Sequence, residues 1–591
     1  MNKIAIITIT VFSLMGCHQP KEKEAKDIKD LSVLTDQYYE DRLKLYPLEA
    51  TSIGDNRYND LLPNSGSAKF IKEEHDFYQK YLTQLKTYDR NILDENEKLS
   101  YDILEDELTM GLEAQKKHFE YMPFDQFNSL PLIMGQLGSG EGMQPFKTIK
   151  DYNRWLKRIA SFSVWADTAI ANFQKGAQKG IVLPRALVVK MIPQMQNMVV
   201  TDPSKSLFYG PINKMPKTFS KADKKWLRDA YNKAILTEIV PTYKKLGDYL
   251  QQEYLPKSRN TSGLSALPEG KAMYAFLVKQ QTTTQKTPEE IYQTGLQEVA
   301  RISAVMDSVK THVGFKGSLK TFFNYMKDEP KFMPYKTPQD VLDAFENIHK
   351  SMEPNLKKMF KNTPKTPFEI RQTEAFRAAT ASAEYHQGSA DGKRPGIFYV
   401  PILNAKKFNT TSGMESLFLH EAIPGHHYQI SLQQENTSLP KFRRFGGFYN
   451  AYVEGWALYC ESLGKELGLY TDTYQYMGAL GDEMHRAIRL VVDVAIHTKG
   501  MTREQAINYM MDHEAISGQG ATAEIERYMA IPAQALGYKI GAIKIQELRK
   551  KYQKSMGNKF NLADFHDQLL KDGPMPLGIL EKKMDAWASA Y

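Results

Sequence analysis

Cysteine is almost absent from this sequence of 591 residues, which contains only Cys17 and Cys460. Because Cys17 lies in an N-terminal leader, no disulfide bond is expected within the folded part of the chain. Exported proteins with small cores commonly rely on disulfides for stability. A chain without them must instead depend on a large buried hydrophobic core.

Long hydrophobic runs and several common functional motifs are also missing. The apolar stretch 4–15 has 12 residues, whereas a membrane-spanning helix needs about 20. No glycine-rich phosphate loop and no Gly-x-Ser-x-Gly motif occurs. The formal charge of +8 is small for this length, and the basic clusters at 221–228 and 549–551 are typical of solvated surface. We therefore expect no nucleic-acid partner.

The N-terminal leader has the pattern of a bacterial lipoprotein signal peptide, predicted to be residues 1–17. Lys3 supplies the positive charge, an apolar stretch follows, and Leu-Met-Gly-Cys at 14–17 resembles a lipobox. Cys17 would then be lipidated, with acyl chains such as palmitate, and would become the new N-terminus. The alternative is an ordinary secretory signal peptide.

Residues 18–30 are rich in Lys, Glu and Asp and are predicted to form a flexible tether. His18 follows Cys17 in place of Asp, which favours sorting to the outer membrane of a Gram-negative cell. The predicted location is the cell envelope. Lipidated Cys17 would anchor the protein to the lipid bilayer, facing the periplasm or the cell surface.

The remainder, 31–591, is predicted to be a single large helical domain, with two lobes around a cleft. Strand signals are few, and the clearest lies at 385–402, where 390–393 could form the turn of a hairpin. A strand beside a functional site would suit binding of an extended peptide by edge pairing. Helical periodicity recurs at 31–46, 67–89, 95–118, 149–176, 221–253, 287–312, 338–361 and 475–498.

The octet His-Glu-Ala-Ile-Pro-Gly-His-His at 420–427 combines metal ligands with an acid. Two His residues and a Glu this close can hold a zinc ion and place a general base, Glu421, beside it. In the usual zinc-peptidase motif the second His lies four residues after the first. Here that position is Pro424, which cannot donate a hydrogen bond to the carbonyl of His420.

An unbroken helix through the octet is therefore not expected. Gly425 tolerates unusual backbone conformations, and we predict a local bulge that absorbs two residues. His420 and His426 would then be neighbours, as if four residues apart. Whether His426 or His427 is the second ligand stays open at this point.

A third ligand is needed, because catalytic zinc keeps three protein ligands and one open position. The best candidate is Glu454, which lies in an aromatic helical run at 448–463. A carboxylate in such apolar surroundings is costly unless it is paired or bound to metal. Gly455 leaves room for another element to approach closely. The alternative is a core Glu paired with an Arg.

A further helix carries His485, Arg489, Asp493 and His497 at four-residue spacing on an otherwise apolar segment. Metal-bound His residues commonly donate their second N–H to a carboxylate, so Asp493 is a candidate partner behind a ligand. Arg489, His497 and His427 are candidates for the same supporting layer. The alternative is a structural ladder of ion pairs between packed helices.

Two tyrosines downstream are candidates for stabilising a developing oxyanion. Tyr528 ends Glu-Ile-Glu-Arg-Tyr at 524–528, and Tyr538 lies in the segment 532–541. A second His-Glu pair, at 513–514, has Ser517 four residues after the His. Serine is not a usual zinc ligand, so this pair is predicted to lie on the surface.

Together these blocks resemble a bacterial family catalogued as a domain of unknown function, number 885. The matching motifs are H-E-A-I-P-G-H-H, E-G-W-A-L-Y, E-x-x-R-Y and P-x-Q-A-L-x-Y-K-I-G, with a further segment at 385–400. That family is similar to the gluzincin metallopeptidases. The resemblance implies a mainly α, zincin-like (oligopeptidase-like) fold and a zinc site that includes His420, Glu421, His426 and Glu454.

The predicted function is a zinc-dependent hydrolase, and specifically a peptidase that cleaves peptides in the cell envelope. One Zn²⁺ per chain would be held by His420, His426 and Glu454, and Glu421 would act as general base. The alternatives are a non-catalytic metal- or ligand-binding lipoprotein and a zinc hydrolase of another amide or ester. Glu421 favours catalysis, because a binding site needs the ligands but not that base.

Overall fold

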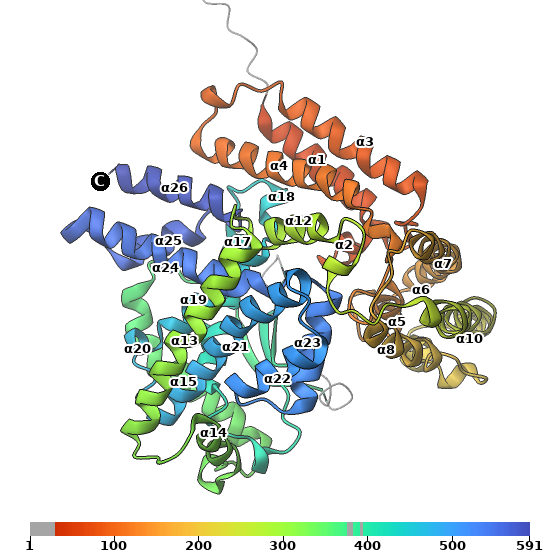
Figure 1. Cartoon of the computed structure of the whole chain (residues 1–591). Coiled ribbons are helices and arrows are strands. Elements are labelled where there is room, and N and C mark those ends of the chain that lie inside the picture. Colours follow the sequence, from red (N-terminus) through yellow and green to blue (C-terminus); the bar gives the residue numbers. More distant parts are fainter. Residues whose placement is uncertain (1–29, 375–381, 390–393, 591) are drawn as a thin grey trace, which may run out of the picture.

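The computed structural model describes residues 30–374, 382–389 and 394–590. The leader, Cys17, nearly all of the predicted tether and the predicted turn at 390–393 lie outside these residues. Within them the chain is mainly helical and has one small sheet, which confirms the prediction of a mainly helical chain with a small β element (Figure 1). None of the described helices is long and apolar enough to span a membrane.

The first half of the chain contributes the N-terminal helices and a separate lobe. The N-terminal helices are α1 (Leu31–Leu45), α2 (Pro47–Ser52), α3 (Ala68–Leu85) and α4 (Glu95–Ala114). The lobe consists of α5 (Leu130–Gly138), α6 (Ile149–Ala160), α7 (Phe162–Gln178), α8 (Arg185–Gln196), α9 (Gly210–Asn213), α10 (Lys221–Ala234) and α11 (Val240–Tyr249). It has a hydrophobic cluster of its own, around Trp155 and Phe173.

The second half forms the rest of the body. Its first helices are α12 (Gly270–Thr282), α13 (Pro288–His312), α14 (Leu319–Asp328) and α15 (Pro338–Met359). After the sheet follow α16 (Met414–Glu421), α17 (His426–Glu435), α18 (Lys441–Arg444), α19 (Asn450–Ser462), α20 (Gly464–Leu467) and α21 (Thr473–Thr498). The last are α22 (Arg503–His513), α23 (Gly518–Ala530), α24 (Leu536–Met556), α25 (Leu562–Leu570) and α26 (Leu577–Ser589).

Most of the predicted helices agree with the observed ones. Two predicted segments are less regular than expected. The segment 149–176 is divided at Ser161 into α6 and α7. The segment 221–253 contains stretches of π-helix at 235–239 and 250–254.

The sheet has the strand order β1-β3-β2, with β1 (Phe368–Gln372), β2 (Glu384–His386) and β3 (Gly396–Val400). The strands β2 and β3 are antiparallel and fall at the predicted position, whereas β1 was not predicted and pairs parallel with β3. β2 therefore lies at one edge of the sheet.

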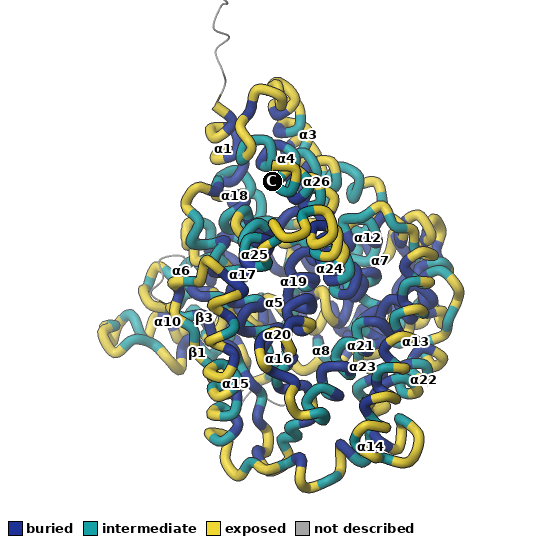
Figure 2. Tube along the Cα trace, turned by 90° about the vertical axis from the view of Figure 1, so that its left-hand side faces the viewer, coloured by how far each residue is buried: buried dark blue, intermediate teal, exposed yellow. Residues whose placement is uncertain are grey.

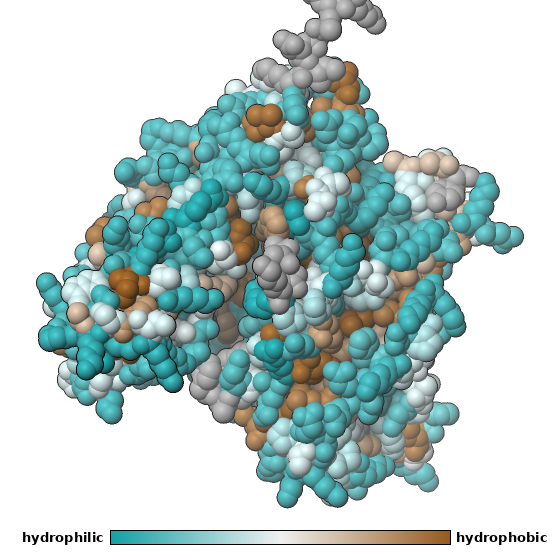
Figure 3. Space-filling view, turned by 180° about the vertical axis from the view of Figure 1, so that it is seen from behind, coloured by the Kyte–Doolittle hydropathy of each residue, from teal (hydrophilic) through white to brown (hydrophobic). Residues whose placement is uncertain are grey.

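The centre of the body is formed by buried helices that cross closely. Figure 2 shows buried segments running through the middle of the molecule. α19 and α24 pack against each other at two glycines, where a β-carbon on Gly455 would lie 2.5 Å from the Cα of Gly541. The space predicted at Gly455 is thus occupied by α24. From behind, Figure 3 shows the surface hollowed between the lobe, at the left, and the body.

Candidate metal centre

The octet is not a bulged helix but a junction between two helices. α16 ends at Glu421, a turn covers 422–425, and α17 begins at His426. The Ile423–Pro424 peptide bond is cis. The prediction of a bulge was wrong in this respect, because the chain leaves the helix completely at Ala422 (φ −105°, ψ −102°).

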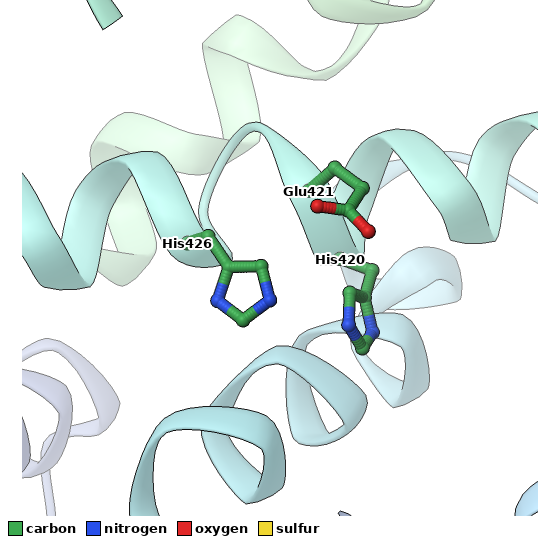
Figure 4. Close-up of side chains that lie close together, drawn as sticks. All are labelled: His420, Glu421 and His426. Atoms are coloured by element: carbon green, nitrogen blue, oxygen red, sulfur yellow. The ribbon is translucent and has the colours of Figure 1, made fainter. Parts of the chain in front are cut away.

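The junction nevertheless brings the two His residues together as predicted. The backbone of Gly425 lies against the last turn of α16, and a β-carbon there would collide with the carbonyl oxygens of His420 and Leu419. Glycine is required for this close approach. As a result, the ring centroids of His420 and His426 are 4.9 Å apart (Figure 4).

Glu454 of α19 faces both rings with one carboxylate oxygen. Its Oε2 lies 3.5 Å from Nε2 of His420 and 3.6 Å from Nε2 of His426. These distances exceed an ordinary hydrogen bond. They are close to the separation of two ligands of a tetrahedral ion, roughly 3.3 Å for bonds of about 2 Å. Burial alone would raise the pKa of Glu454, but the two imidazoles outweigh it and hold the pKa well below its usual range.

The second nitrogen of His420 is held by a carboxylate that the sequence did not single out. Nδ1 of His420 donates to Oε1 of Glu461, also on α19, at 2.7 Å. This bond leaves Nε2 of His420 facing Glu454 and His426. Burial lowers the pKa of His420, but Glu454 and Glu461 together raise it to about 10.

Glu421 lies at the same junction. Ligand atoms of His420, Glu421 and His426 lie within 4.8 Å of one another and form a group that could hold a metal ion. Figure 4 shows the Glu421 carboxylate beside the two rings. Its Oε2 also accepts a hydrogen bond of 3.0 Å from the backbone N–H of Tyr385 in β2. The edge strand of the sheet thus contacts the site directly.

His427 points away from the other two histidines. Its Nδ1 lies 3.0 Å from the hydroxyl of Tyr385, and its ring packs against Phe368. Burial lowers the pKa of His427 to about 4, so the ring is neutral near pH 7. The structure therefore brings His426, and not His427, to His420 and Glu454. His427 instead holds the residue that contacts Glu421.

The two candidate tyrosines differ in their hydrogen bonding. Tyr528 is fully buried, donates to Glu524 at 2.6 Å and accepts from Nε of Arg489 at 2.9 Å. Tyr538 stacks on His420, with ring centroids 6.4 Å apart. Among the described residues its hydroxyl has no hydrogen-bond partner. Tyr538 is therefore better placed than Tyr528 to donate a hydrogen bond to a bound molecule. The Arg489 guanidinium lies 4.8 Å from the Tyr538 ring and supports it from behind.

Asp493 and His497 lie in a different cluster of α21. Asp493 accepts from the hydroxyl of Tyr274 at 2.6 Å and from the backbone N–H of Ala533 at 3.1 Å. His497 accepts from the N–H of Leu264 and donates to a backbone carbonyl. The expectation that Asp493 backs a metal-site His was wrong, because Glu461 takes that position.

The second His-Glu pair also differs from its prediction. Glu514 is buried rather than on the surface, and its carboxylate lies 2.8 Å from Nδ1 of His485. His485 in turn lies 3.4 Å from Glu524. The part of α21 that carries His485 and Arg489 therefore forms ion pairs with the helices packed against it.

Fold and site together define a class of protein: a large helical chain with a His/Glu group, His420 of which is buried, that could hold a metal ion. The family described as "Bacterial protein of unknown function (DUF885)" matches residues 47–584, and the chain belongs to this family. This confirms the family resemblance of the motifs. No curated protein matches the chain.

Two solved structures are similar over nearly their whole length. One is named a putative lipoprotein from Colwellia psychrerythraea, with a TM-score of 0.85 and 27% identity, covering 95% of this chain and 99% of that chain. The other is named a putative lipoprotein of unknown function from Shewanella oneidensis, with a TM-score of 0.74 and 19% identity, covering 94% and 99%. The second likeness concerns the fold alone.

Proposed function

We propose that this protein is a zinc-dependent peptidase of the cell envelope, related to the gluzincins. His420, His426 and Glu454 would hold one Zn²⁺, and Glu421 would be the general base. The observation that carries the proposal is the contact of two imidazole Nε2 atoms with the same oxygen of Glu454, at 3.5 and 3.6 Å.

The donor set suits zinc. Two imidazole nitrogens and one carboxylate oxygen match the ligands of catalytic sites that keep a fourth position open. Glu461 would fix the ring of His420, in the way that carboxylates commonly support zinc-bound His residues. A zinc ion bound here would polarise a peptide carbonyl and lower the pKa of its bound water toward about 7.

The residues of this chain would then handle the protons. Glu421 would accept a proton from the attacking water and deliver it to the leaving amine. The N–H of Tyr385 would hold the Glu421 carboxylate in place. The hydroxyl of Tyr538 would donate to the oxygen on which negative charge develops.

A peptide substrate suits the surroundings of this site. Tyr385 belongs to β2, at the edge of the sheet, so an extended peptide could pair with the sheet beside Glu421. Lipidation of Cys17 is part of the proposal and would anchor the enzyme to a membrane. It is supported by the lipobox and by the name of the similar structure from Colwellia psychrerythraea.

The test is Glu421→Gln, which keeps the size of the side chain but removes the base. We expect the variant to retain zinc and melting temperature, while peptide hydrolysis falls about 10²–10⁴-fold. Zinc content, melting temperature and cleavage of a mixed peptide library are measured on the same preparation.

Glu415→Gln is the matched control, because Glu415 lies on the same helix but its carboxylate binds the N–H of Tyr470. It should cleave like the wild type. Equal cleavage by Glu421→Gln would contradict the mechanism. A wild-type protein that binds zinc but cleaves no peptide would point to the non-catalytic function instead.

A further inference from the structure

A pocket of about 330 Å³ lies where the N-terminal helices meet the body. Its walls come from α1, α3 and α4 on one side, and from α12 and the turn at 447–449 on the other. An ion pair of 2.8 Å between Lys279 of α12 and Glu113 of α4 joins the two sides. In Figure 1 the N-terminal helices are at the top, and α12 lies beneath them. The proposed zinc ligands and Glu421 do not line this pocket, so it is separate from the metal centre.

Asp106 of α4 is a carboxylate in this lining that has no partner. It is half-buried, and it forms no hydrogen bond or ion pair with any described residue. Both of its oxygens keep some accessible surface, because neither is among the fully enclosed polar atoms that lack a partner. Burial raises the pKa of Asp106 to about 6, although nearby Lys279 acts to lower it. The ionised carboxylate is therefore poorly solvated and can be reached from the pocket.

The other charged side chains of the lining already have partners. Arg42 contacts both Glu49 and Glu107, at 2.9 and 2.5 Å. Lys279 is neutralised by its ion pair with the α4 carboxylate that lies outside the lining. When these partners are included, two cations share the surroundings of the pocket with four carboxylates. An anionic ligand would thus find no free counter-charge, whereas a cation would.

A metal ion does not suit this carboxylate. Hard cations such as Ca²⁺ and Mg²⁺ need about six oxygen ligands. Among the described residues, the groups of three side chains that could hold a metal ion do not include Asp106. The neighbouring acid in the lining, Glu107, is engaged by Arg42. A cation that needs only one carboxylate fits better, and ammonium and guanidinium groups have this property.

The aromatic side chains of the pocket favour an organic cation. Tyr78, Phe448 and Tyr449 belong to the lining, and Phe448 is 71% exposed. The faces of aromatic rings attract ammonium and guanidinium groups, and the same rings can pack against an alkyl stem. The volume is at the small end of ligand pockets, about 300–1,000 Å³, which suits one such group with a short stem.

We propose that this pocket binds an organic cation, an ammonium or guanidinium group on an alkyl stem, which pairs with Asp106. The group could belong to the amino terminus of a peptide, to a Lys or Arg side chain, or to a small free amine, because the chemistry is the same in all three. Binding at this pocket goes beyond the proposed peptidase activity and does not require it.

The experiment is a calorimetric titration of the full-length protein with n-butylguanidinium, n-butylammonium and n-butanol. We expect each cation to bind about 10–100-fold more tightly than the neutral alcohol, because a hydrogen bond to a charged partner is stronger than one between neutral groups. Guanidinium has no lone pair for a metal ion, so this probe separates the pocket from the metal centre. Equal or undetectable binding of all three compounds would overturn the proposal.

Asp106→Asn tests the residue itself. The affinity for both cations should fall to that for butanol, while the melting temperature stays equal or rises, because the variant removes a poorly solvated charge. Asp102→Asn is the matched control. Asp102 lies on the same helix but is bound by Arg90, at 2.6 Å, and does not line the pocket, so this variant should bind the cations like the wild type. Unchanged cation binding in Asp106→Asn would contradict the proposal.

Phe448→Leu provides the test if Asp106→Asn does not fold. Leucine keeps an apolar side chain but has no ring face, so the affinity for the cations should fall about 2–5-fold while that for butanol is unchanged. Phe127→Leu is the control, because Phe127 is 46% exposed and does not line the pocket. Equal effects of the two changes on cation binding would count against the pocket.

Peptides distinguish the sources of the cation. The titrations use Glu421→Gln protein, so that no peptide is cleaved, and compare free with acetylated amino termini, and Lys with norleucine in acetylated peptides. Tighter binding of the free terminus or of the Lys peptide, lost when Asp106→Asn is added, supports the pocket and identifies the source. Binding of the butyl cations alone restricts the ligand to small amines. A preference for the charged peptide that survives Asp106→Asn would overturn the pocket as its site.

Discussion

Two clusters of His and carboxylate residues, one buried and one nearly so, lie in the second half of the chain, and they differ in their hydrogen bonding. In the α21 cluster (Tyr274, Asp493 and His497) the carboxylate and both ring nitrogens have hydrogen-bond partners at ordinary distances. In the metal-site cluster (His420, His426 and Glu454) two nitrogens face one oxygen at 3.5 and 3.6 Å, without ordinary hydrogen bonds.

Glu454 lies on the apolar helix α19, and Asp493 and His497 lie on the apolar helix α21, so the helices that carry the two acids do not distinguish the clusters. What distinguishes the two clusters is whether their polar atoms have hydrogen-bond partners at ordinary distances. A buried polar group with all partners present holds helices together. The atoms of the metal-site cluster instead face one another at 3.5 and 3.6 Å, close to the separation of two ligands of one ion. Behind the metal-site cluster, Nδ1 of His426 and Oε2 of Glu461 also have no partner among the described residues.

The largest expected difference between the clusters is in metal content. The wild type should contain about one zinc per chain, and His420→Ala or Glu454→Ala should lose it, because each removes one of three ligands. Asp493→Asn in the α21 cluster should retain it. Elemental analysis of the four purified proteins decides this. Full zinc in the two Ala variants would remove the site assignment.

The two tyrosines give the next largest contrast. Removal of one oxyanion donor typically lowers kcat about 10²–10³-fold, and we expect this for Tyr538→Phe. Tyr528→Phe should change kcat less than tenfold, because its hydroxyl is already occupied by Glu524 and Arg489. Steady-state kinetics on zinc-loaded protein measures both. The reverse order would assign the role to Tyr528.

Glu461→Gln should have a smaller effect: the protein should still bind zinc, but with lower affinity. Loss of a carboxylate behind a zinc-bound His typically weakens metal binding about 10–100-fold. Glu415→Gln, a change of the same type on α16, should leave the affinity unchanged. Zinc titration against a competing chelator compares the variants. An unaltered affinity in Glu461→Gln would mean that its bond to His420 only stabilises the fold.

The smallest expected effect concerns stability against pH in the α21 cluster. Burial lowers the pKa of His497 from 6.5 to about 3, so the unfolded chain binds a proton at this residue before the folded one does. The contribution of His497 to the free energy of unfolding should therefore fall as pH falls from about 6.5 toward 3, by up to about 1.4 kcal/mol per pH unit. Asp493, whose pKa burial raises to about 7, contributes with the opposite sign, so the effect of His497 is read from the difference between the wild type and a variant. Denaturant titrations at several pH values should show a shallower fall for His497→Gln. Identical slopes would contradict the assignment.

Side-chain type was sufficient to predict from the sequence most residues of the candidate site. The octet and Glu454 were predicted because a His-Glu pair near further His residues, and an acid in an aromatic helix, are rare without a function. Glu461 was missed, although the argument for Glu454 applies equally to it. It lies in the same apolar run, among Tyr459, Cys460 and Leu463.

What the sequence could not supply is the contact between distant elements. Both Glu461 and Asp493 lie on apolar helices, so the sequence does not show which of them bonds to His420. That depends on how α16 packs on α19. The strand β1 was not predicted; it is the direct neighbour of β3 in the sheet, although β2 lies between the two in the sequence. The helix junction at Pro424 was predicted only as a disturbance, because proline excludes the regular helix but does not determine what replaces it.

The contact between Gly455 and Gly541 has a consequence for how this site can change during evolution. α19 carries Glu454, and α24 carries Tyr538, so the gap between these helices sets the distance between a proposed ligand and the proposed hydroxyl donor. A single methyl group at either glycine would force the helices apart. Two residues without side chains must therefore be kept together if Glu454 and Tyr538 are to keep their distance. A search for functional positions based on reactive groups would pass over both.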